Sequence, residues 1–283
     1  GLICDPAVFP PGSAPLPDPV ARHRAHRTSA YAECGGPLLV PAASAAELVS
    51  VLDAALGGDA DGNETPTASE RLEVVLILRP GADPTLLTAA SDALRGDGRV
   101  RVVGAELGWY DGWSEHLAGD LPLAVEVPRG AHQASALDEI RTAHRTGHDV
   151  VVKFRTGPTP TWPWPDEHEL ADVLRSVSPE VPFKLTGGLH HAVRGTYAVD
   201  GVPEENHGVL NVLLATSAAL DGAGHDEVAG LLALRDARSL AALVGSWPES
   251  TATLVRSAFT AYGCCTVTDP IDELTALRLL TKD

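Results

Sequence analysis

From residue 36 onward, short and nearly continuous apolar runs alternate with longer segments in which apolar residues recur with a helical period. Strands that are apolar on both faces are typical of a parallel sheet covered by helices. The apolar runs predict seven strands, over residues 36–42, 72–80, 100–107, 121–127, 149–155, 181–187 and 261–267. The alternation therefore predicts an α/β fold.

Helix signals occupy the segments between these strands. Ser44 and Glu47 form the residue pair of a capping box, and Asp83 begins another helix with a proline at its first position. The segment between strands 100–107 and 121–127 has room for only one or two helical turns. The other predicted helices cover residues 135–146, 167–177 and most of 204–262.

A (β/α)8 barrel needs one strand more than these seven. The eighth strand is expected either before residue 36 or at residues 208–215. A doubly wound open sheet is the alternative, but no glycine fingerprint for a nucleotide follows the first strand. We therefore predict a TIM-barrel-like (β/α)8 domain over residues 36–283. An irregular, proline-rich arm over 1–35 precedes it, and a helical insertion near 204–262 interrupts it.

The composition narrows the classes of partner. A net charge of −17 argues against nucleic acid and anionic membranes, and no apolar run reaches the length of a membrane helix. The N-terminal residues lack the pattern of a secretory signal, and the four cysteines contain no C-x-x-C pair. We expect a cytoplasmic, bacterial enzyme of small-molecule metabolism, without a metal or cofactor. The sequence does not decide whether the chain forms a homo-oligomer.

Two of the predicted strands each contain a lysine. Lys153 and Lys184 lie near the carboxyl ends of adjacent strands, where barrel enzymes carry their active sites. Glu106 and Glu126 occupy corresponding places on the two preceding strands. One interpretation is a set of structural ion pairs, for example between Glu126 and Lys153.

The second interpretation is amine chemistry. Two nearby ammonium groups lower each other's pKa, and burial lowers both further. A neutral amine is a nucleophile toward a carbonyl, and a nearby carboxylate can relay protons.

Three short motifs carry a resemblance to a known family. KFRTG (153–157) resembles the K-x-x-T-G motif of deoxyribose-phosphate aldolases, and KLTGGL (184–189) resembles the K-x-[ST]-G-G-[IL] motif of the following strand. GCC (263–265) resembles the G-x-S end of the last strand. The resemblance implies a class I, metal-free aldolase or related lyase, in which Lys153 forms the Schiff base and Lys184 tunes it. The segment between Gly188 and Gly263 is longer than one β-α unit, and cysteines replace the small hydroxyl residues of the family.

Other polar residues fit the same hypothesis. Catalytic roles are predicted for Lys153, Lys184, Glu126, Glu106 and, as a proton shuttle, His190. Arg155 and Arg194 are expected to hold an anionic group of a small carbonyl substrate. The remaining predicted substrate-binding residues are Thr186, Gly187, Gly188, Gly263 and Cys264.

Two alternatives stay open. One is a divalent-metal-dependent isomerase or hydrolase that uses Glu106, Glu126 and a histidine. The other is a non-catalytic binding barrel with salt-bridged lysines. The Pro/Trp-rich segment 156–169 is predicted either to cover the site or to pack on the barrel rim. His168 and His225 are expected to be surface or loop residues.

Overall fold

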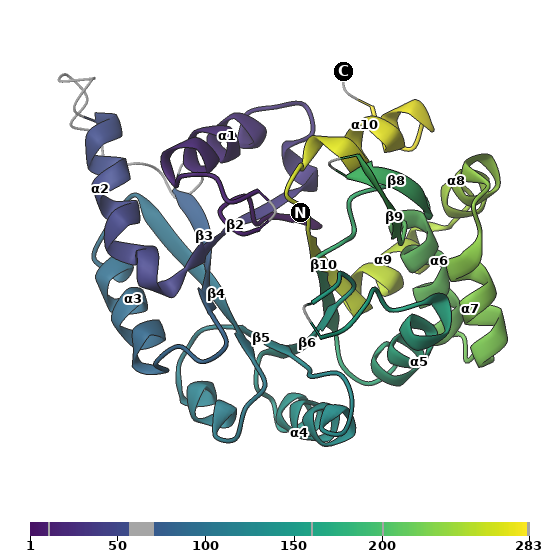
Figure 1. The fold of residues 1–283 in the computed structure, drawn as a ribbon, viewed down its shortest axis with the longest axis horizontal. Coiled ribbons are helices and arrows are strands. Elements are labelled where there is room, and N and C mark those ends of the chain that lie inside the picture. Colours follow the sequence, from purple (N-terminus) through teal and green to yellow (C-terminus); the bar gives the residue numbers. More distant parts are fainter. Residues whose placement is uncertain (11, 57–70, 160, 200, 282–283) are drawn as a thin grey trace.

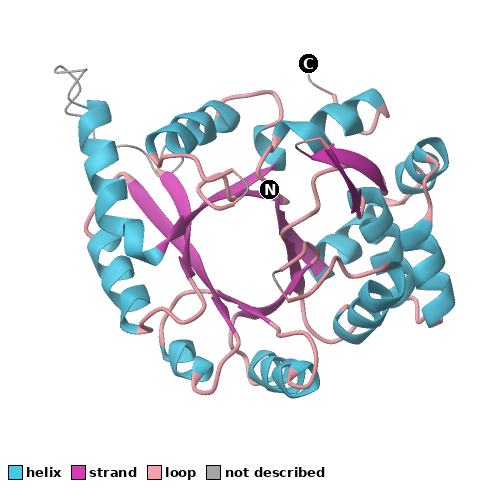
Figure 2. Cartoon of the chain, viewed as in Figure 1, coloured by secondary structure: helices cyan, strands magenta, loops and turns pink. Residues whose placement is uncertain are grey.

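Eight parallel strands form a closed barrel in the computed structural model, which describes residues 1–10, 12–56, 71–159, 161–199 and 201–281 (Figures 1 and 2). The order around the barrel is β1-β10-β7-β6-β5-β4-β3-β2. The strands span Ile3–Asp5 (β1), Gly35–Pro41 (β2), Leu72–Leu78 (β3), Val100–Gly108 (β4), Leu123–Glu126 (β5), Val150–Arg155 (β6), Phe183–Thr186 (β7) and Phe259–Gly263 (β10). The predicted TIM-barrel-like fold is confirmed.

The N-terminal residues belong to the barrel, so the expected irregular arm over 1–35 is wrong. Strand β1 closes the sheet by pairing with β10 and β2, with Ile3 opposite both Tyr262 and Gly35. Helix α1 (Pro17–Arg27) and a 3-10 turn (Ala32–Cys34) follow it. The alternative eighth strand at 208–215 is helical and lies in α6 (Val209–Leu220). A three-residue strand is too short to show a readable period, which is why the sequence pattern misses it.

Helices surround the barrel and cover its outer face (Figure 1). Apolar side chains such as Leu48, Leu52 and Leu94 are fully buried beneath them, and each such burial stabilises the fold by about 1.5–3 kcal/mol. Only a 3-10 helix (Trp113–Ala118) stands between β4 and β5, as the short segment predicted. The helices between the earlier strands are α2 (Ala45–Leu56), α3 (Thr85–Arg95), α4 (Gln133–Arg145) and α5 (Glu167–Val177), and α10 (Thr268–Ala276) ends the described chain.

The long connection between β7 and β10 contains the expected helical insertion and, before it, an unexpected hairpin. Strands β8 (Gly195–Val199) and β9 (Val202–Asn206) pair antiparallel. The Tyr197 ring stacks on His191, and its hydroxyl donates to the Val193 carbonyl at 2.7 Å. The helices that follow the hairpin are α6, α7 (His225–Ala233), α8 (Ala237–Gly245) and α9 (Glu249–Ala258). In the described part of the chain, no helix is long and apolar enough to cross a membrane.

The ends of β6 and β7 approach each other unusually closely. A Cβ atom at Gly157 would collide with the backbone carbonyl of Gly187. Gly187 itself has a φ of +70°, which disfavours residues with a side chain. The glycines that follow the two lysine-bearing strands thus allow the strand ends, and with them the lysines, to lie side by side.

Candidate active site

Glu106 and both lysines meet in the barrel interior. Lys153 on β6 stands directly opposite Lys184 on β7. Glu106 on β4 lies 2.8 Å from the Lys153 ammonium through Oε2, and its Oε1 accepts a hydrogen bond from Lys184 Nζ. All three side chains are less than a tenth exposed. One carboxylate therefore bridges two buried ammonium groups, as charge compensation in a low-dielectric interior requires.

A second carboxylate holds Lys153 from the other side. Glu126 on β5 is in register with Lys153, and its Oε2 lies 3.0 Å from the ammonium. Its Oε1 accepts from Arg155 Nε at 2.9 Å. Lys184 has a further partner in Cys4 of β1, whose Sγ lies 3.3 Å from Nζ. Lys153 thus contacts two carboxylates, whereas Lys184 contacts one carboxylate and a thiol.

The pKa of Lys153 corrects the expectation of a depressed value. Burial alone would lower it, but the charges of Glu106 and Glu126 outweigh burial, and the net shift is upward. The Lys184 charge does lower the Lys153 pKa, although it is the weakest of these influences. For Lys184, burial alone would likewise lower the pKa, but its ion pair with Glu106 and its hydrogen bond to Cys4 outweigh burial, so its pKa is also raised. Both lysines are cations in the resting protein.

The pKa of Glu106 moves in the opposite direction. Burial would raise it, but the two ammonium groups dominate and lower it to about 2. The pKa of Glu126 is likewise lowered, since Lys153 and Arg155 outweigh its burial. The two carboxylates are therefore anions at neutral pH.

A cavity of about 870 Å³ opens onto this charge network. Glu106, Glu126, Lys153 and Arg155 are part of its wall. Among the described residues that line the cavity, Lys184 is absent. Lys153 is therefore the lysine that a small molecule in the cavity can contact.

The cavity wall contains most of the other predicted site residues. Thr186, Gly187, Gly188, His190 and Gly263 line it. Burial lowers the pKa of His190, so its ring is neutral at neutral pH and can accept a proton.

Two predicted substrate-binding residues lie elsewhere. Cys264 is fully buried, with its Sγ 3.7 Å from His190 Nδ1, and its neighbour Cys265 lines the cavity instead. Burial raises the pKa of the Cys264 thiol. Arg194 forms an ion pair at 2.8 Å with Glu167 of α5 and is not part of the cavity wall formed by the described residues.

The Pro/Trp-rich segment contributes one tryptophan to the site. Trp164 lines the cavity and packs over Gly188, where a Cβ atom would collide with its ring. Trp162 is 43% exposed, with the Arg129 guanidinium 5.0 Å from its ring centroid. Trp164 thus forms part of the wall beside the lysine-bearing strands, and Trp162 lies at the surface.

Sequence reasoning missed polar residues in two places, one beside the cavity wall (Asp5, next to the lining residue Pro6) and one within it. Asp5 at the end of β1 is 3% exposed and accepts from the Ala7 amide at 3.0 Å, and burial raises its pKa. The hairpin adds Tyr197, Glu204 and Asn206 to the cavity wall. An acidic residue directly after the apolar run LIC was a usable signal for Asp5. The hairpin residues carry no comparable signal, because their strands are short and polar.

The metal-dependent alternative would use the carboxylates of Glu106 and Glu126, whose oxygens already have partners. Both oxygens of Glu106, and both of Glu126, contact cationic side chains. In the described ranges, neither glutamate belongs to a group of three potential metal ligands. A metal at Glu106 and Glu126 would therefore have to displace the lysines and Arg155.

Comparison with known proteins gives one structural similarity. No family model matches the sequence, and no curated protein does. A solved structure described as "QR15, an Aldolase" is similar with a TM-score of 0.49 and 10% sequence identity, over 97% of this chain and 95% of that chain.

Proposed function

We propose that this protein is an enzyme of the lyase type that acts on a small, anionic carbonyl compound through an imine on Lys153. The observation that carries the proposal is the position of the Lys153 ammonium. Lys153 lines a cavity of about 870 Å³, and its ammonium contacts the buried carboxylate of Glu106 and the half-buried carboxylate of Glu126. An ion-pair network that served stability alone would not need a cavity beside its most polar atoms.

The resting charge state defines the first step. Lys153 must give up one proton before it can attack a carbonyl carbon. Glu126 is the better acceptor, because two ammonium groups hold Glu106 in its anionic form with a pKa of about 2, whereas Glu126 contacts one ammonium group, that of Lys153, and Arg155. Substrate entry displaces water from the cavity, which favours the neutral amine and carboxylic acid over the ion pair.

The later steps follow from the chemistry of an amine and a carbonyl. The amine forms a C–N bond, and the carbonyl oxygen takes up two protons and leaves as water. The protonated imine then withdraws electrons, so the bond from the adjacent carbon to a hydroxyl-bearing carbon can break: the hydroxyl loses its proton and becomes the carbonyl of the released fragment, the bonding pair forms a C=C bond, and the C=N pair moves to the nitrogen. Protonation of the resulting enamine and hydrolysis of the imine release the second product and restore the Lys153 amine. Glu126 and His190, both in the cavity wall, are placed to relay the protons.

Local charge supports an anionic substrate. Elsewhere in its wall, the cavity contains Arg79, Glu204 and Asp269. Within the ion-pair network beside Lys153, three cations (Lys153, Lys184 and Arg155) stand against the two carboxylates of Glu106 and Glu126. Arg155 uses Nε to bind Glu126 and lines the cavity. A substrate carboxylate or phosphate near Arg155 would balance this surplus.

Lys184 has the role of a fixed cation in this proposal. It holds Glu106 in its anionic form and keeps some positive charge near Lys153. When imine formation consumes the Lys153 ammonium, Lys184 remains to compensate Glu106. Lys184 therefore lowers the pKa of Lys153 less than the sequence predicted.

Borohydride trapping tests the proposal directly. The protein is incubated with a panel of small aldehydes, ketones and 2-oxo acids, reduced, and mapped by mass spectrometry. The sequence contains only three lysines, so adducts on Lys282 and the N-terminal amine measure unspecific reaction. We expect a saturable adduct on Lys153 that Lys153→Met abolishes while the Lys282 signal persists.

Two further outcomes of the trapping experiment test the role of Lys184 and the imine proposal itself. Lys184→Met is expected to retain the Lys153 adduct but to slow its formation several-fold at neutral pH, because the charge that lowers the Lys153 pKa is gone. If the folded wild-type protein labels Lys153 no faster than Lys282 with every carbonyl compound, the imine proposal is wrong and the ion pairs are structural.

A further inference from the structure

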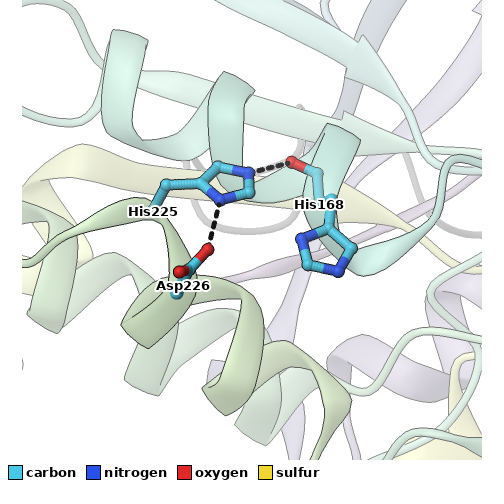
Figure 3. A group of neighbouring side chains, drawn as sticks. All are labelled: His168, His225 and Asp226. Carbon is cyan, nitrogen blue, oxygen red and sulfur yellow. Dashed lines mark hydrogen bonds and ion pairs between the residues drawn. The ribbon is translucent and has the colours of Figure 1, made fainter.

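Two histidines and an aspartate gather on the outer surface where α5 and α7 pack together (Figure 3). His168 belongs to α5, while His225 and Asp226 are the first residues of α7. One ligand atom from each of the three lies within 4.8 Å of the others. In the part of the chain that the structure describes, this is the one group of three such side chains close enough to share a metal ion.

Both ring nitrogens of His225 face oxygen acceptors. Its Nε2 lies 3.2 Å from the backbone carbonyl oxygen of His168 and 3.5 Å from Asp172 Oδ1. Both neighbours are acceptors, so Nε2 carries a hydrogen atom. The other nitrogen, Nδ1, lies 3.1 Å from the acceptor Asp226 Oδ1 and donates to it (Figure 3), so a metal ion at Nδ1 would replace that proton while Nε2 keeps its own. Metal-binding histidines in proteins typically donate their second ring N–H to a carbonyl or carboxylate in this way.

We propose that His168, His225 and Asp226 form a binding site for a divalent transition-metal ion of the Zn²⁺ type. The ligands would be a ring nitrogen of His168, Nδ1 of His225 and a carboxylate oxygen of Asp226. Imidazole and carboxylate are ligands that zinc accepts, and three protein ligands leave one position for water. The site lies outside the barrel cavity and does not depend on the imine chemistry.

Binding of a metal ion requires these side chains to reorient. Ligand atoms around a tetrahedral zinc lie about 3.3 Å apart, because each bond is about 2.0–2.1 Å long. His168 and Asp226 are exposed side chains, and His225 is half-buried. The rings of His168 and His225 stack with their centroids 5.2 Å apart, so the exposed His168 ring must rotate out of the stack to direct a nitrogen at an ion that His225 binds.

The ion would join two helices that are distant in the sequence. The beginning of α5 is already held through Glu167 to Arg194 and through Glu169 to Arg129. A metal bridge would fix the same turn of α5 to the start of α7. Because the unfolded chain does not hold these ligands together, binding stabilises the folded state in proportion to metal concentration.

Calorimetric titration of the tag-free, EDTA-treated protein with ZnCl₂ tests the site. We expect one Zn²⁺ per chain and, at a hundredfold excess over Kd, a rise in Tm on the order of 5 °C. His168→Ala and His225→Ala should each weaken binding by more than roughly tenfold, since even outer partners of a metal ligand contribute that much. Asp172→Asn should cause a smaller loss.

His148→Ala is the matched control, because His148 is also exposed and lies on the loop after α4. It should leave the affinity unchanged. Unfolding in EDTA checks that the surface variants keep the wild-type Tm without metal. Full Zn²⁺ affinity in the His168→Ala/His225→Ala double variant would overturn the proposal and place the ion at another site, such as the cysteines. A wild-type protein that takes up no Zn²⁺ would overturn it as well.

Discussion

At the scale of single residues, Glu106 has the largest electrostatic effect on the site. It is the one carboxylate that contacts both buried ammonium groups among the described residues. Its charge raises the pKa of Lys153 and Lys184, and theirs lower its own to about 2. The three groups therefore stabilise one another only in their charged forms.

Glu106→Gln should accordingly destabilise the protein and change its response to acid. Glu106 has a pKa of about 2 in the folded protein against an ordinary value of 4.5, so its contribution is present above pH 4.5 and is lost as the pH falls toward 2. The shift corresponds to about 3 kcal/mol at neutral pH. Urea unfolding should show a loss of this order at pH 7, with the two stability curves converging near pH 2.

Glu73→Gln is the control for this prediction. Glu73 pairs with Arg101 on the barrel exterior, where the arginine side chain is 54% exposed, and such a pair contributes about 0–1 kcal/mol. A Glu106→Gln variant no less stable than Glu73→Gln at pH 7 would mean that the buried network is not held together by charge.

The sequence predicted which charged residues meet in the barrel better than it predicted their protonation. Side chains alternate between the two faces of a strand, and barrel enzymes carry polar site residues at the carboxyl ends of strands. These two regularities depend only on the direction of the chain, and they predicted correctly that Lys153, Glu106 and Glu126 lie close together. The pKa of Lys153 depends on which charges lie closest, and the spacing of residues along the chain does not give those distances. Two carboxylates at about 3 Å outweigh the neighbouring lysine, which reverses the expected shift.

At the scale of elements, the β8–β9 hairpin brings an unsatisfied polar group to the cavity. Asn206 ends β9, is 2% exposed and lines the cavity. Within the described residues, its Nδ2 has no hydrogen-bond partner. A buried donor without a partner costs about 1–3 kcal/mol, so we interpret Asn206 as a donor for a substrate oxygen.

Comparison of Asn206→Leu with Asn211→Leu tests this interpretation. Asn211 is fully buried, accepts from the Arg194 amide, and donates to the carbonyls of Leu231 and Leu234 at 2.9 and 2.8 Å. Its loss should cost about 3 kcal/mol or more, whereas Asn206→Leu should be neutral within about 1 kcal/mol. Chemical unfolding measures both. Equal losses in the two variants would show that Asn206 is a structural residue.

At the scale of the whole molecule, the sequence pattern predicted the seven apolar barrel strands and missed β1 and the two hairpin strands. The last predicted strand was displaced, since β10 spans Phe259–Gly263 and not 261–267. The seven predicted strands are regular apolar runs, and the register between them follows from closing a parallel sheet. The strand ICD of β1 has too few residues for a period, and the polar strand VPEEN of β9 lacks an apolar face. Both gain their structure from neighbours far away in the sequence, and both bring polar residues to the interior of the site.

The position of β1 makes the barrel depend on its first residues. β1 is the strand that joins β10 to β2, and it also supplies Cys4 beside Lys184 and the buried Asp5. Deletion of residues 1–5 should therefore expose the edges of two central strands, whose unpaired backbone groups promote aggregation. We expect loss of a single cooperative thermal transition and binding of a dye that detects exposed apolar surface.

Asp5→Asn, which keeps the strand and removes only the charge, should retain cooperative unfolding. A truncated protein that unfolds as cooperatively as Asp5→Asn would show that a seven-stranded sheet suffices and that β1 serves the site alone.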